Sequence, residues 1–545
     1  MHIALSTDRD DRVSITPLDG PGEQQTLARA ALPAAVSLLE AQHSPRWVWD
    51  DTNRWYPALL EAGVRVDRCV DLRLCRAILR NSELTAGSAL ARSASDAWDE
   101  PAHDVGPSDG LFELDERLPL DPVAEFSRQR EAMVPGIRLL LSAESAGALV
   151  AAEIRYAGLP WRADLHRELL ERTLGPRPGV GERPLEMERL AAQIRDHLGA
   201  PSLNPDSPVE LLKALQRAGI NVSSTSKWEL AEVDHAVIGP LLAYKKLARL
   251  LGANGWHWLD ANVRDGRFRP DYVVGGVVTG RWASKGGGGA LQLPRQIRGA
   301  VVADPGWKLV VADASQLEPR ILAAISADRG MVEAGSAGDL YAGIVATGAV
   351  ATRAEAKVAM LGAMYGATTG DSGRLMPALA RAFPRAIELV ERAARAGERG
   401  HRVSTLLGRT SPVPGAAWRE VQAAASAVGA TDAQQRRARS EARTWGRFTR
   451  NFVVQGTAAE WALCWMASLR RRLHELTDGA WITAGPHLVF FMHDELVVHC
   501  PAEIADAVAE AVRVSAAEAG RLLFGELPIE FPLSVAIVDD YGQAK

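Results

Sequence analysis

Two short stretches of the chain carry β-type apolar residues directly into a carboxylate. Val310-Val311-Ala312 precedes Asp313, and Phe490-Phe491-Met492 precedes His493 and Asp494. This pattern predicts that Asp313 and Asp494 stand at strand ends or in a tight turn. Two carboxylates delivered to one place by separate strands can hold two divalent ions that clamp both oxygens of a phosphoryl transfer. A strand-end aspartate taken alone is more often a turn or capping residue.

The segment between these stretches predicts a helix with one distinctive face. Four residues spaced four apart advance by only about 40° per step and form one stripe, namely Arg353, Lys357, Leu361 and Tyr365. Such a face can bind a triphosphate along its two cations while a base meets the Leu361/Tyr365 end. The alternative, which this segment alone favours, is an ordinary amphipathic helix with a solvated basic edge.

The remaining hydrophobic pattern separates an α/β part from a largely helical part. Within residues 1–150 it predicts two strands followed by two helices, at 2–5, 47–49, 56–62 and 72–79. The tract 86–110 is rich in Ser, Ala, Asp and Gly and predicts a loop or a partly disordered excursion. Gly286–Gly289 predicts a flexible connector, which could equally be a DNA-contacting loop. Farther along, the pattern predicts four helices and a final strand, at 153–174, 194–215, 228–252, 418–443 and 531–538.

Composition and charge are those of a soluble globular protein of several domains. The 545 residues are 47% apolar and 24% charged, which is enough for more than one sizeable core. With a net charge of −5 and a pI of about 6.2, any nucleic-acid site has to be a local basic cleft. The basic stretches 244–249 and 436–450 are candidates, although either alone is more typical of a solvated helix face.

Several classes of protein lack support in the sequence. Four cysteines without close pairing predict reduced structural thiols in a cytosolic protein, and His493, His499 and Cys500 do not have a zinc-site spacing. We expect no membrane span, since no run of about 18 apolar residues occurs. We also expect no secretory signal, because the N-terminus lacks a basic region with an apolar core. No Walker-type Gly-x4-Gly-Lys-Ser/Thr sequence is present, which argues against an ATP-driven motor.

Taken in order, the motifs resemble the polymerase region of family A DNA polymerases, the DNA polymerase I type. Three further segments carry the resemblance: Thr279-Gly280-Arg281-Trp282-Ala283-Ser284 followed by Leu291-Gln292-Leu293-Pro294, Arg402-Val403-Ser404-Thr405-Leu406-Leu407-Gly408-Arg409, and Arg447 with Asn451-Phe452-Val453-Val454-Gln455-Gly456-Thr457-Ala458-Ala459. The matches are collinear from residue 150 to residue 545. Five motifs in this order are far less prone to chance agreement than any one of them.

The resemblance implies an α/β and α+β multidomain fold, with an RNase H-like exonuclease-type domain followed by a right-hand polymerase. In chain order the implied parts are a degenerate 3′–5′ exonuclease-like domain, the thumb with connecting helices, the first part of the palm, the fingers and the second part of the palm. Their expected bounds are 1–150, 151–262, 263–320, 321–444 and 445–545.

By the same resemblance, the catalytic centre uses two Mg²⁺ ions, for which Mn²⁺ can substitute. The implied catalytic residues are Asp313, Asp494, Glu495, Lys357 and Arg353. The two aspartates and the backbone carbonyl of Ala314 would hold the metal ions, with Glu495 as a supporting acid. Lys357 would neutralise or protonate the leaving pyrophosphate, and Arg353 would bind the γ-phosphate.

The implied nucleotide-binding residues are Gln316, Glu318, Leu361, Tyr365 and His493. Glu318 would crowd the 2′ position of the sugar and exclude ribonucleotides, although Ser315-Gln316-Leu317-Glu318 also has the pattern of a capping box at a helix start. Both readings can hold together, and the steric role carries more weight. Leu361 stands where the family usually has Phe or Tyr, Ala314 where it usually has Tyr, and Pro319 where it has an aliphatic residue. Nucleotide handling is therefore expected to depart from the family pattern.

The implied DNA-binding residues are Arg281, Arg447, Asn451 and Gln455. Arg281 and Gln455 resemble residues that contact minor-groove acceptors present in every correct base pair, which checks geometry without reading sequence. Arg447 and Asn451, with His493, would steady the primer terminus and the template.

The N-terminal part departs from the family's exonuclease pattern. Ser6-Thr7-Asp8 stands where the family has Asp-Thr-Glu, Trp55 stands where it has a further aspartate, and no Tyr-x3-Asp occurs near 120–145. Exonuclease chemistry needs several carboxylates to hold two metal ions. Asp67 and Asp71 are interpreted as surface or capping residues. The expectation is a degenerate domain, kept as structure, without proofreading.

The resemblance as a whole implies a template-directed DNA polymerase without a 5′-nuclease. Its partners would be primer–template DNA and deoxynucleoside triphosphates, and it would act as a monomer in the bacterial cytoplasm or nucleoid. One alternative is a catalytically silent DNA-binding or scaffold protein on the same fold. Another is a single-subunit RNA polymerase, which would not be expected to carry Glu318 as a sugar gate.

Overall fold

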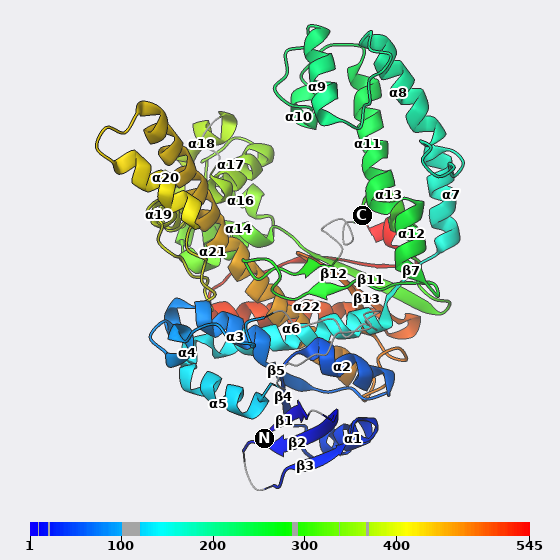
Figure 1. The fold of residues 1–545 in the computed structure, drawn as a ribbon, viewed down its shortest axis with the longest axis vertical. Helices are drawn as coiled ribbons and strands as arrows, with labels where there is room; N and C mark the ends of the chain where they lie inside the picture. The colour runs from blue at the N-terminus through cyan, green and yellow to red at the C-terminus, as the bar shows by residue number, and fades with distance from the viewer. Residues whose placement is uncertain are drawn as a thin grey trace. The chain divides into compact units, whose positions relative to one another are not determined.

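The computed structural model describes residues 1–8, 10–19, 22–100, 120–285, 293–336, 338–366 and 370–544. Backbone contacts divide the chain into two units (Figure 1). The larger unit comprises 1–157, 271–283 and 310–537, and the smaller unit comprises 158–270, 284–309 and 538–545. Three predicted features fall outside the described residues: the Gly286–Gly289 connector, the Leu291-Gln292 part of one motif and the 101–110 part of the predicted loop.

A five-stranded sheet forms the centre of residues 1–157. Its strands are β1 His2–Thr7, β2 Arg12–Pro17, β3 Gln25–Ala28, β4 Arg46–Trp49 and β5 Arg68–Asp71, in the spatial order β3-β2-β1-β4-β5. β2 is antiparallel to β1 and β3, whereas β1, β4 and β5 run parallel. Ile3, Leu5, Trp47 and Trp49 are buried in its core. The strands predicted at 2–5 and 47–49 are confirmed.

Helices connect and cover this sheet. They are α1 Leu32–His43, α2 Thr52–Glu61, α3 Leu72–Asn81, α4 Ala89–Arg92, α5 Pro122–Ala132 and α6 Arg138–Ala157, with short 3₁₀ turns η1 Arg29–Ala31, η2 Glu83–Thr85 and η3 Pro135–Ile137. The side chains of Asp51 and Asp71 cap α2 and α3 by accepting hydrogen bonds from the backbone N–H groups of Asn53 and Leu74. The helices predicted around 56–62 and 72–79 are therefore confirmed. α6 packs against both β5 and the second sheet of the larger unit.

The second sheet has four strands in the order β12-β13-β11-β14. They are β11 Trp307–Ala314, β12 His487–Met492, β13 Glu495–Pro501 and β14 Leu533–Val538, and β14 confirms the strand predicted at 531–538. Almost every residue of β12 and β13 is buried, as expected for strands covered on both faces. The helix α22 Ala505–Phe524, which follows the 3₁₀ turn η4 Ala502–Ile504, packs on β13. A small two-stranded sheet joins β9 Tyr272–Val273 and β10 Ala283–Ser284.

In the described part of the chain, eight α-helices lie between β11 and β12. They are α14 Leu317–Ser326, α15 Arg329–Ser336, α16 Leu340–Ala346, α17 Arg353–Tyr365, α18 Gly370–Ala382, α19 Pro384–Glu398, α20 Ala416–Ser426 and α21 Asp432–Glu475. α17 confirms the helix predicted for the cationic stripe. It starts at a capping box made by Thr352 and Glu355 and ends at Gly366, whose φ is 72°. α19 and α21 make the most extensive helix pair of the larger unit (Figure 1).

The prediction of one continuous helix over 418–443 is wrong, because two helices, α20 and α21, cover this range. The chain leaves the helical conformation after Ser426, since Gly429 has a φ of 87° and Thr431 starts a new capping box with Gln434. The new helix, α21, then runs for 44 residues and passes through the predicted boundary between 444 and 445 without a break.

The smaller unit is mainly helical. Its helices are α7 Ala163–Leu174, α8 Leu185–His197, α9 Pro208–Arg217, α10 Lys227–Leu230, α11 Ile238–Asn254, α12 Trp256–Asn262 and α13 Arg295–Arg298, with a C-terminal 3₁₀ turn η5 Tyr541–Ala544. A three-stranded sheet in the order β6-β8-β7 is built from β6 Leu159–Pro160, β7 Val263–Arg264 and β8 Arg267–Phe268.

Three predicted helices are interrupted in the structure. The one at 153–174 breaks at Gly158, whose φ is 72°, because that conformation ends α6. The one at 194–215 splits where Ser207 caps α9 and Pro208 takes its first position. The one at 228–252 is α10 and α11, separated by a turn at 231–237. Among the described residues, none of the helices is long and apolar enough to cross a membrane.

Candidate active site

The two acidic motifs meet at the end of the four-stranded sheet. Asp313 is the penultimate residue of β11, and Asp494 lies in the two-residue turn between β12 and β13. The backbone N–H of Ala314 donates a hydrogen bond of 2.8 Å to the carbonyl of Asp494. His493 makes the turn possible with a left-handed φ of 60°. The predicted strand-end and turn positions are confirmed, and the two half-buried carboxylates come from directly bonded segments.

This pair suits a hard divalent cation. Mg²⁺ prefers oxygen ligands and is commonly bound through one or two carboxylates completed by water and substrate phosphates. In the described part of the chain no group of three or more His, Cys, Asp and Glu side chains is arranged to hold a metal ion. Glu495, the first residue of β13, is buried beside the turn.

Glu318 is the centre of a hydrogen-bond network that joins four predicted site residues. Its Oε1 accepts a hydrogen bond from Arg281 Nη2 at 2.5 Å, and its Oε2 accepts one from the Tyr365 hydroxyl at 2.8 Å. Gln455 Nε2 in turn donates to the Tyr365 hydroxyl oxygen at 3.2 Å. Burial, followed by the neighbouring Glu318 carboxylate, raises the pKa of the Tyr365 phenol above its usual value. The network connects α14, α17, α21 and the 271–283 segment.

The predicted capping box at Ser315-Gln316-Leu317-Glu318 is wrong. α14 begins at Leu317, so Gln316 occupies the N-cap position with a φ of 57°, and its side chain does not cap this helix. Ser315 lies one residue too early for a cap. Its N–H donates to the Pro532 carbonyl at 3.1 Å instead. Glu318 is thereby released from any capping role and turns toward Arg281 and Tyr365.

Arg353 is oriented by an acidic residue that the sequence reasoning missed. Arg353 Nε donates to Asp339 Oδ2 at 2.7 Å, and its guanidinium lies 5.5 Å from the centre of the Tyr341 ring. Gln316 Nε2 donates to the other oxygen of Asp339 at 2.8 Å. Burial alone would raise the pKa of Asp339, but the hydrogen bonds from Arg353 and Gln316 lower it to about 2. An aspartate directly before an apolar helix start, here Leu340, was the available sequence signal.

The stripe on α17 is exposed along its whole length. Arg353 and Lys357 face solvent, and Leu361 and Tyr365 are 37% and 40% exposed. The opposite face, which includes Ala356, Ala359, Met360, Ala363 and Met364, is buried. The structure confirms the stripe predicted from spacing. An exposed stripe is also what a plain amphipathic helix would show, so its ligand stays a prediction.

Three of the remaining site residues lie on one helix, α21. Arg447, Asn451 and Gln455 follow each other at four-residue spacing. Arg447 Nη2 donates to Thr444 at 2.8 Å, and its side chain lies against Gly366 at the end of α17, where an added Cβ would approach its Cγ to 2.7 Å. Gln455 reaches Tyr365 as described, whereas His493 is exposed at the β12–β13 turn. These residues therefore adjoin α17 without all touching one another.

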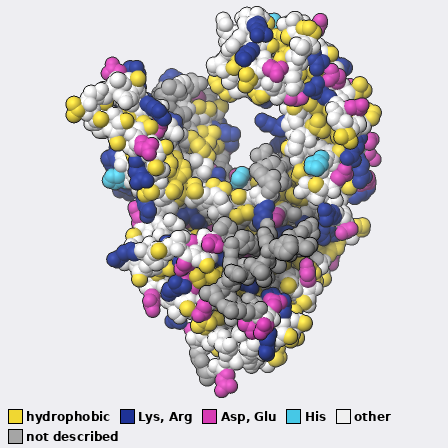
Figure 2. Space-filling view, viewed as in Figure 1, with side chains coloured by type: hydrophobic (Ala, Val, Ile, Leu, Met, Phe, Trp, Pro, Cys, Tyr) yellow, Lys and Arg dark blue, Asp and Glu magenta, His cyan; other side chains and the backbone are white. Residues whose placement is uncertain are grey.

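The two basic stretches considered from sequence are partly structural. Arg450 is buried and donates to the carbonyl of Ala363 at 2.9 Å, and Tyr244 is buried with its hydroxyl bonded to Asp206 at 2.7 Å. Arg447 and several neighbouring arginines stay exposed. On the face shown in Figure 2, Lys and Arg side chains are interspersed with Asp and Glu, in keeping with the small net charge.

The carboxyl edge of the N-terminal sheet is hydrogen-bonded to a half-buried arginine. Arg54 donates to Asp50 Oδ2 at the end of β4, at 2.9 Å, and to Thr7 Oγ1 at the end of β1, at 2.7 Å. Trp55 Nε1 donates to the other oxygen of Asp50 at 2.6 Å. Since a guanidinium and an indole already occupy this aspartate, the edge offers a poor setting for metal ions.

Asp71, the last residue of β5, is a capping residue but not a surface one. It is 2% exposed and accepts hydrogen bonds from both the N–H and the hydroxyl of Thr52 at 2.8 Å. Burial, and after it the nearby Asp51 carboxylate, raises its pKa to about 7. Asp67 is half-buried at the surface and lies 3.7 Å from Arg68.

Comparisons with known proteins show the family to which this chain is related. The profile of DNA polymerase family A matches residues 182–541. The thermostable DNA polymerase I of Thermus aquaticus is 27% identical over 395 residues, covering 66% of this chain and 41% of that protein. DNA polymerase I of Chloroflexus aurantiacus is 28% identical over 333 residues, covering 55% of this chain and 32% of that protein.

The chain thus spans less than half the length of these curated relatives. In the fold comparison it matches the POL domain of Pol1 from M. smegmatis, solved in complex with DNA primer-template and dNTP. That match has a TM-score of 0.70 and 19% identity and covers 99% of this chain and 95% of the other. The family profile covers well over half of the chain, and the protein therefore belongs to DNA polymerase family A.

Proposed function

We propose that this chain is a template-directed DNA polymerase that adds deoxynucleotides to a primer 3′-OH by a two-metal mechanism. The observation that carries the proposal is the meeting of Asp313 and Asp494, joined by the bond from the Ala314 N–H to the Asp494 carbonyl. Membership of DNA polymerase family A supports the same reaction. So does the likeness in fold to a polymerase domain solved with primer-template and dNTP.

Different residues of the chain would act on the attacking primer hydroxyl and on the leaving pyrophosphate. Asp313, Asp494 and the Ala314 carbonyl would hold Mg²⁺, and bound Mg²⁺ would acidify the primer hydroxyl and neutralise phosphate charge. Arg353, kept in orientation by Asp339, would bind the terminal phosphate. Lys357, one turn farther along the same exposed stripe, would donate to the departing pyrophosphate oxygen.

Sugar selection would depend on Glu318. Its carboxylate is held from two sides, by Arg281 and by Tyr365, which makes it a rigid wall against a 2′-hydroxyl. Arg281 and Gln455 would contact minor-groove acceptors of the terminal base pair. Leu361 brings no ring and no hydroxyl to the nucleotide, so we expect weaker stacking on the base than with an aromatic residue.

The N-terminal domain would be RNase H-like but without exonuclease activity. Its strand order, with β1, β4 and β5 parallel, supports the fold. The lack of activity is supported by Arg54, which bonds to Thr7 and Asp50 where catalytic metal ions would need carboxylates. Proofreading would then be absent.

The test is extension of a labelled primer with Mg²⁺ and deoxynucleotides. Wild type should extend it, and Asp313→Ala or Asp494→Ala should abolish extension. Asp506→Ala, an exposed aspartate on α22, serves as the matched control and should stay active. Primer–template binding without extension by the wild type would instead favour the catalytically silent scaffold. Robust extension by both site variants would refute the assignment of the metal ligands.

A further inference from the structure

A loop between α19 and α20 contacts both the N-terminal domain and the segments that carry Arg281 and Gln455. This loop, residues 402–411, folds back on itself through a β-bridge between Ser404 and Thr410. The N–H of Thr405 donates to the Arg409 carbonyl at 2.8 Å, and that of Ser411 to the Val403 carbonyl at 2.9 Å. All of the contacts described below lie within the larger unit.

One side of the 402–411 loop is held by the residues that follow α3. Ser82 Oγ donates to the Gly408 carbonyl at 2.7 Å, and the N–H of Glu83 donates to Thr410 Oγ1 at 3.0 Å. The Leu84 side chain fills the space beside Gly408, where an added Cβ would lie 2.5 Å from its Cδ1. Gly408 has a φ of 96°, so this close approach needs glycine.

Apolar packing reinforces the same contact. Leu407, at the tip of the loop, is buried in a cluster formed by the N-terminal domain. The other buried members of that cluster are Cys75, Ile78, Leu79, Leu90, Ala132, Ile137, Leu140 and Leu141. The loop tip is therefore part of the core of the N-terminal domain, although it follows α3 by more than 300 residues in the sequence.

A buried ion pair connects the loop to the segment that carries Arg281. Arg409 Nη2 donates to Glu144 Oε2 on α6 at 2.7 Å, and the Glu144 side chain is only 1% exposed. The Arg409 guanidinium lies against Gly280, where an added Cβ would be 2.5 Å from its Nε. Gly280 directly precedes Arg281, so the ion pair packs against the backbone immediately before Arg281.

The other side of the loop is bonded to α21 next to Gln455. The N–H groups of Leu406 and Leu407 donate to Thr457 Oγ1 at 3.2 Å and to Glu460 Oε2 at 3.1 Å. The Thr405 methyl group fills the space beside Gly456, where an added Cβ would approach it to 2.4 Å. One loop therefore supports both residues that are candidates for minor-groove contact.

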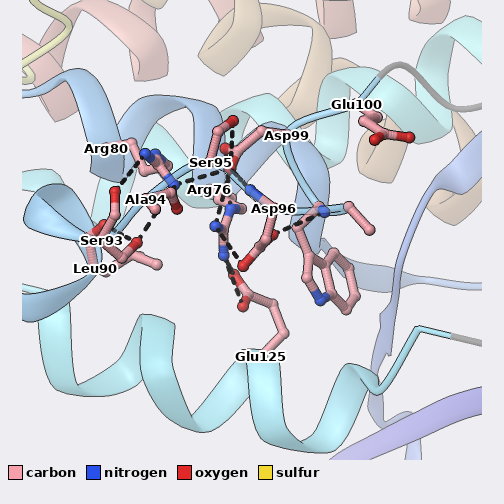
Figure 3. Close-up of polar contacts among 12 residues, drawn as sticks. Arg76, Arg80, Leu90, Ser93, Ala94, Ser95, Asp96, Asp99, Glu100 and Glu125 are labelled. Atoms are coloured by element: carbon pink, nitrogen blue, oxygen red, sulfur yellow. Dashed lines mark hydrogen bonds and ion pairs between the residues drawn. The ribbon is translucent and has the colours of Figure 1, made fainter. Parts of the chain in front are cut away.

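The residues Ser82–Leu84, which hold the 402–411 loop and are called the clamp below, follow a helix that is itself firmly anchored. Figure 3 shows Arg76 of α3 surrounded by carboxylates, with both oxygens of Glu125 at 3.0 Å and bonds to Asp99 at 3.1 and 3.0 Å. The side chains of Arg76 and Glu125 are 1% and 0% exposed. Arg80, one turn farther along, also bonds to Asp99 at 2.8 Å. α3 is thereby tied to α5 close to the point where Ser82 leaves it.

We propose that the N-terminal domain acts as a positioning element for DNA binding. Through Ser82, Leu84 and Glu144 it holds the 402–411 loop, and the loop fixes the backbone at Arg281 and Gln455. The proposal rests on the proposed polymerase function, and in particular on these two residues contacting the primer–template. Under this proposal the N-terminal domain, which lacks the exonuclease carboxylates, contributes to DNA binding by the polymerase part of the chain.

The experiment measures kcat and KM for primer–template in steady-state extension. Ser82→Ala/Leu84→Ala should raise the KM for primer–template by about three- to tenfold, the range that one lost hydrogen bond is worth, with kcat nearly unchanged. Ser127→Ala/Leu38→Ala, at exposed positions of the same domain, is the matched control and should leave both constants unchanged. Ser82→Thr with Leu84 intact keeps the hydroxyl and should restore the wild-type KM.

A double-variant cycle separates positioning from general loss of structure. In a Gln455→Ala background the Ser82→Ala/Leu84→Ala change should raise the KM by a smaller factor than in wild type, since one of the two contacts that the loop positions is already gone. An equal rise in KM with and without Gln455, or an unchanged KM in the folded clamp variant, would overturn the proposal. An inactive wild type would instead refute the proposed function, so the two failures are distinguishable.

Discussion

Glu460 offers a direct test of how the 402–411 loop is bonded to α21. Its carboxyl is buried, with Oε2 accepting from the Leu407 N–H at 3.1 Å and Oε1 hydrogen-bonded to the Thr405 hydroxyl. The Thr405 hydroxyl also lies 3.2 Å from the Arg409 carbonyl. A neutral Glu460 carboxyl satisfies both hydrogen bonds, because its O–H can donate to the Thr405 hydroxyl oxygen while the Thr405 O–H donates to the Arg409 carbonyl. Glu460→Gln presents an N–H group in place of that O–H and mimics the neutral form.

The magnitude follows from the pKa. Burial raises the pKa of Glu460 from 4.5 to about 7, which corresponds to about 3 kcal/mol of free energy of unfolding. Because the folded-state pKa is raised, the folded protein retains a proton that the unfolded chain has released. The wild-type free energy of unfolding therefore falls as the pH rises from about 4.5 to about 7 and is then level for this group. The amide variant lacks this loss.

Urea unfolding followed by tryptophan fluorescence at several pH values measures the effect. Glu460→Gln should match wild type near pH 4.5 and exceed it above pH 7.5 by about 3 kcal/mol, a midpoint shift of roughly 1 M for a slope of about 3 kcal/mol per M. Glu475→Gln, an exposed position near the end of the same helix, should show no pH-dependent difference. A Glu460→Gln advantage that is independent of pH, or a loss of stability above pH 7, would refute the reasoning.

Three further outcomes are expected. Glu318→Ala should increase ribonucleotide incorporation relative to deoxynucleotide incorporation in a competition assay, and unchanged selectivity would contradict the gate. Asp339→Asn should raise the KM for deoxynucleotides about three- to fivefold with little change in the KM for DNA, because the exposed Arg353 loses the charged partner that orients it; an unchanged KM for deoxynucleotides would show that Asp339 does not position Arg353. A mismatched primer incubated with Mg²⁺ and no nucleotides should not shorten, and shortening that survives Asp313→Ala would show that the edge occupied by Arg54 has exonuclease activity after all.

The sequence by itself determined the local features of the candidate site. Strand ends, tight turns and helix stripes are written in short-range patterns, because β-propensity, turn chemistry and the 3.6-residue period act over a few residues. This is why Asp313 and Asp494 could be placed at a strand end and in a turn, and why the stripe from Arg353 to Tyr365 was recognised. The order of the motifs along the chain was enough to indicate the family.

Only the tertiary structure decided which side chains meet. From the sequence, Glu318 could belong to a helix cap as well as to a sugar gate. In the structure the left-handed Gln316 takes the cap position and Arg281 is a partner of Glu318. Asp339 and the clamp at Ser82 have no periodic signature, and Ser82 bonds to a carbonyl 326 residues away. Polar contacts of this kind depend on the path of the chain through space. No spacing in the sequence encodes them, because the two partners share neither a helix face nor a strand register.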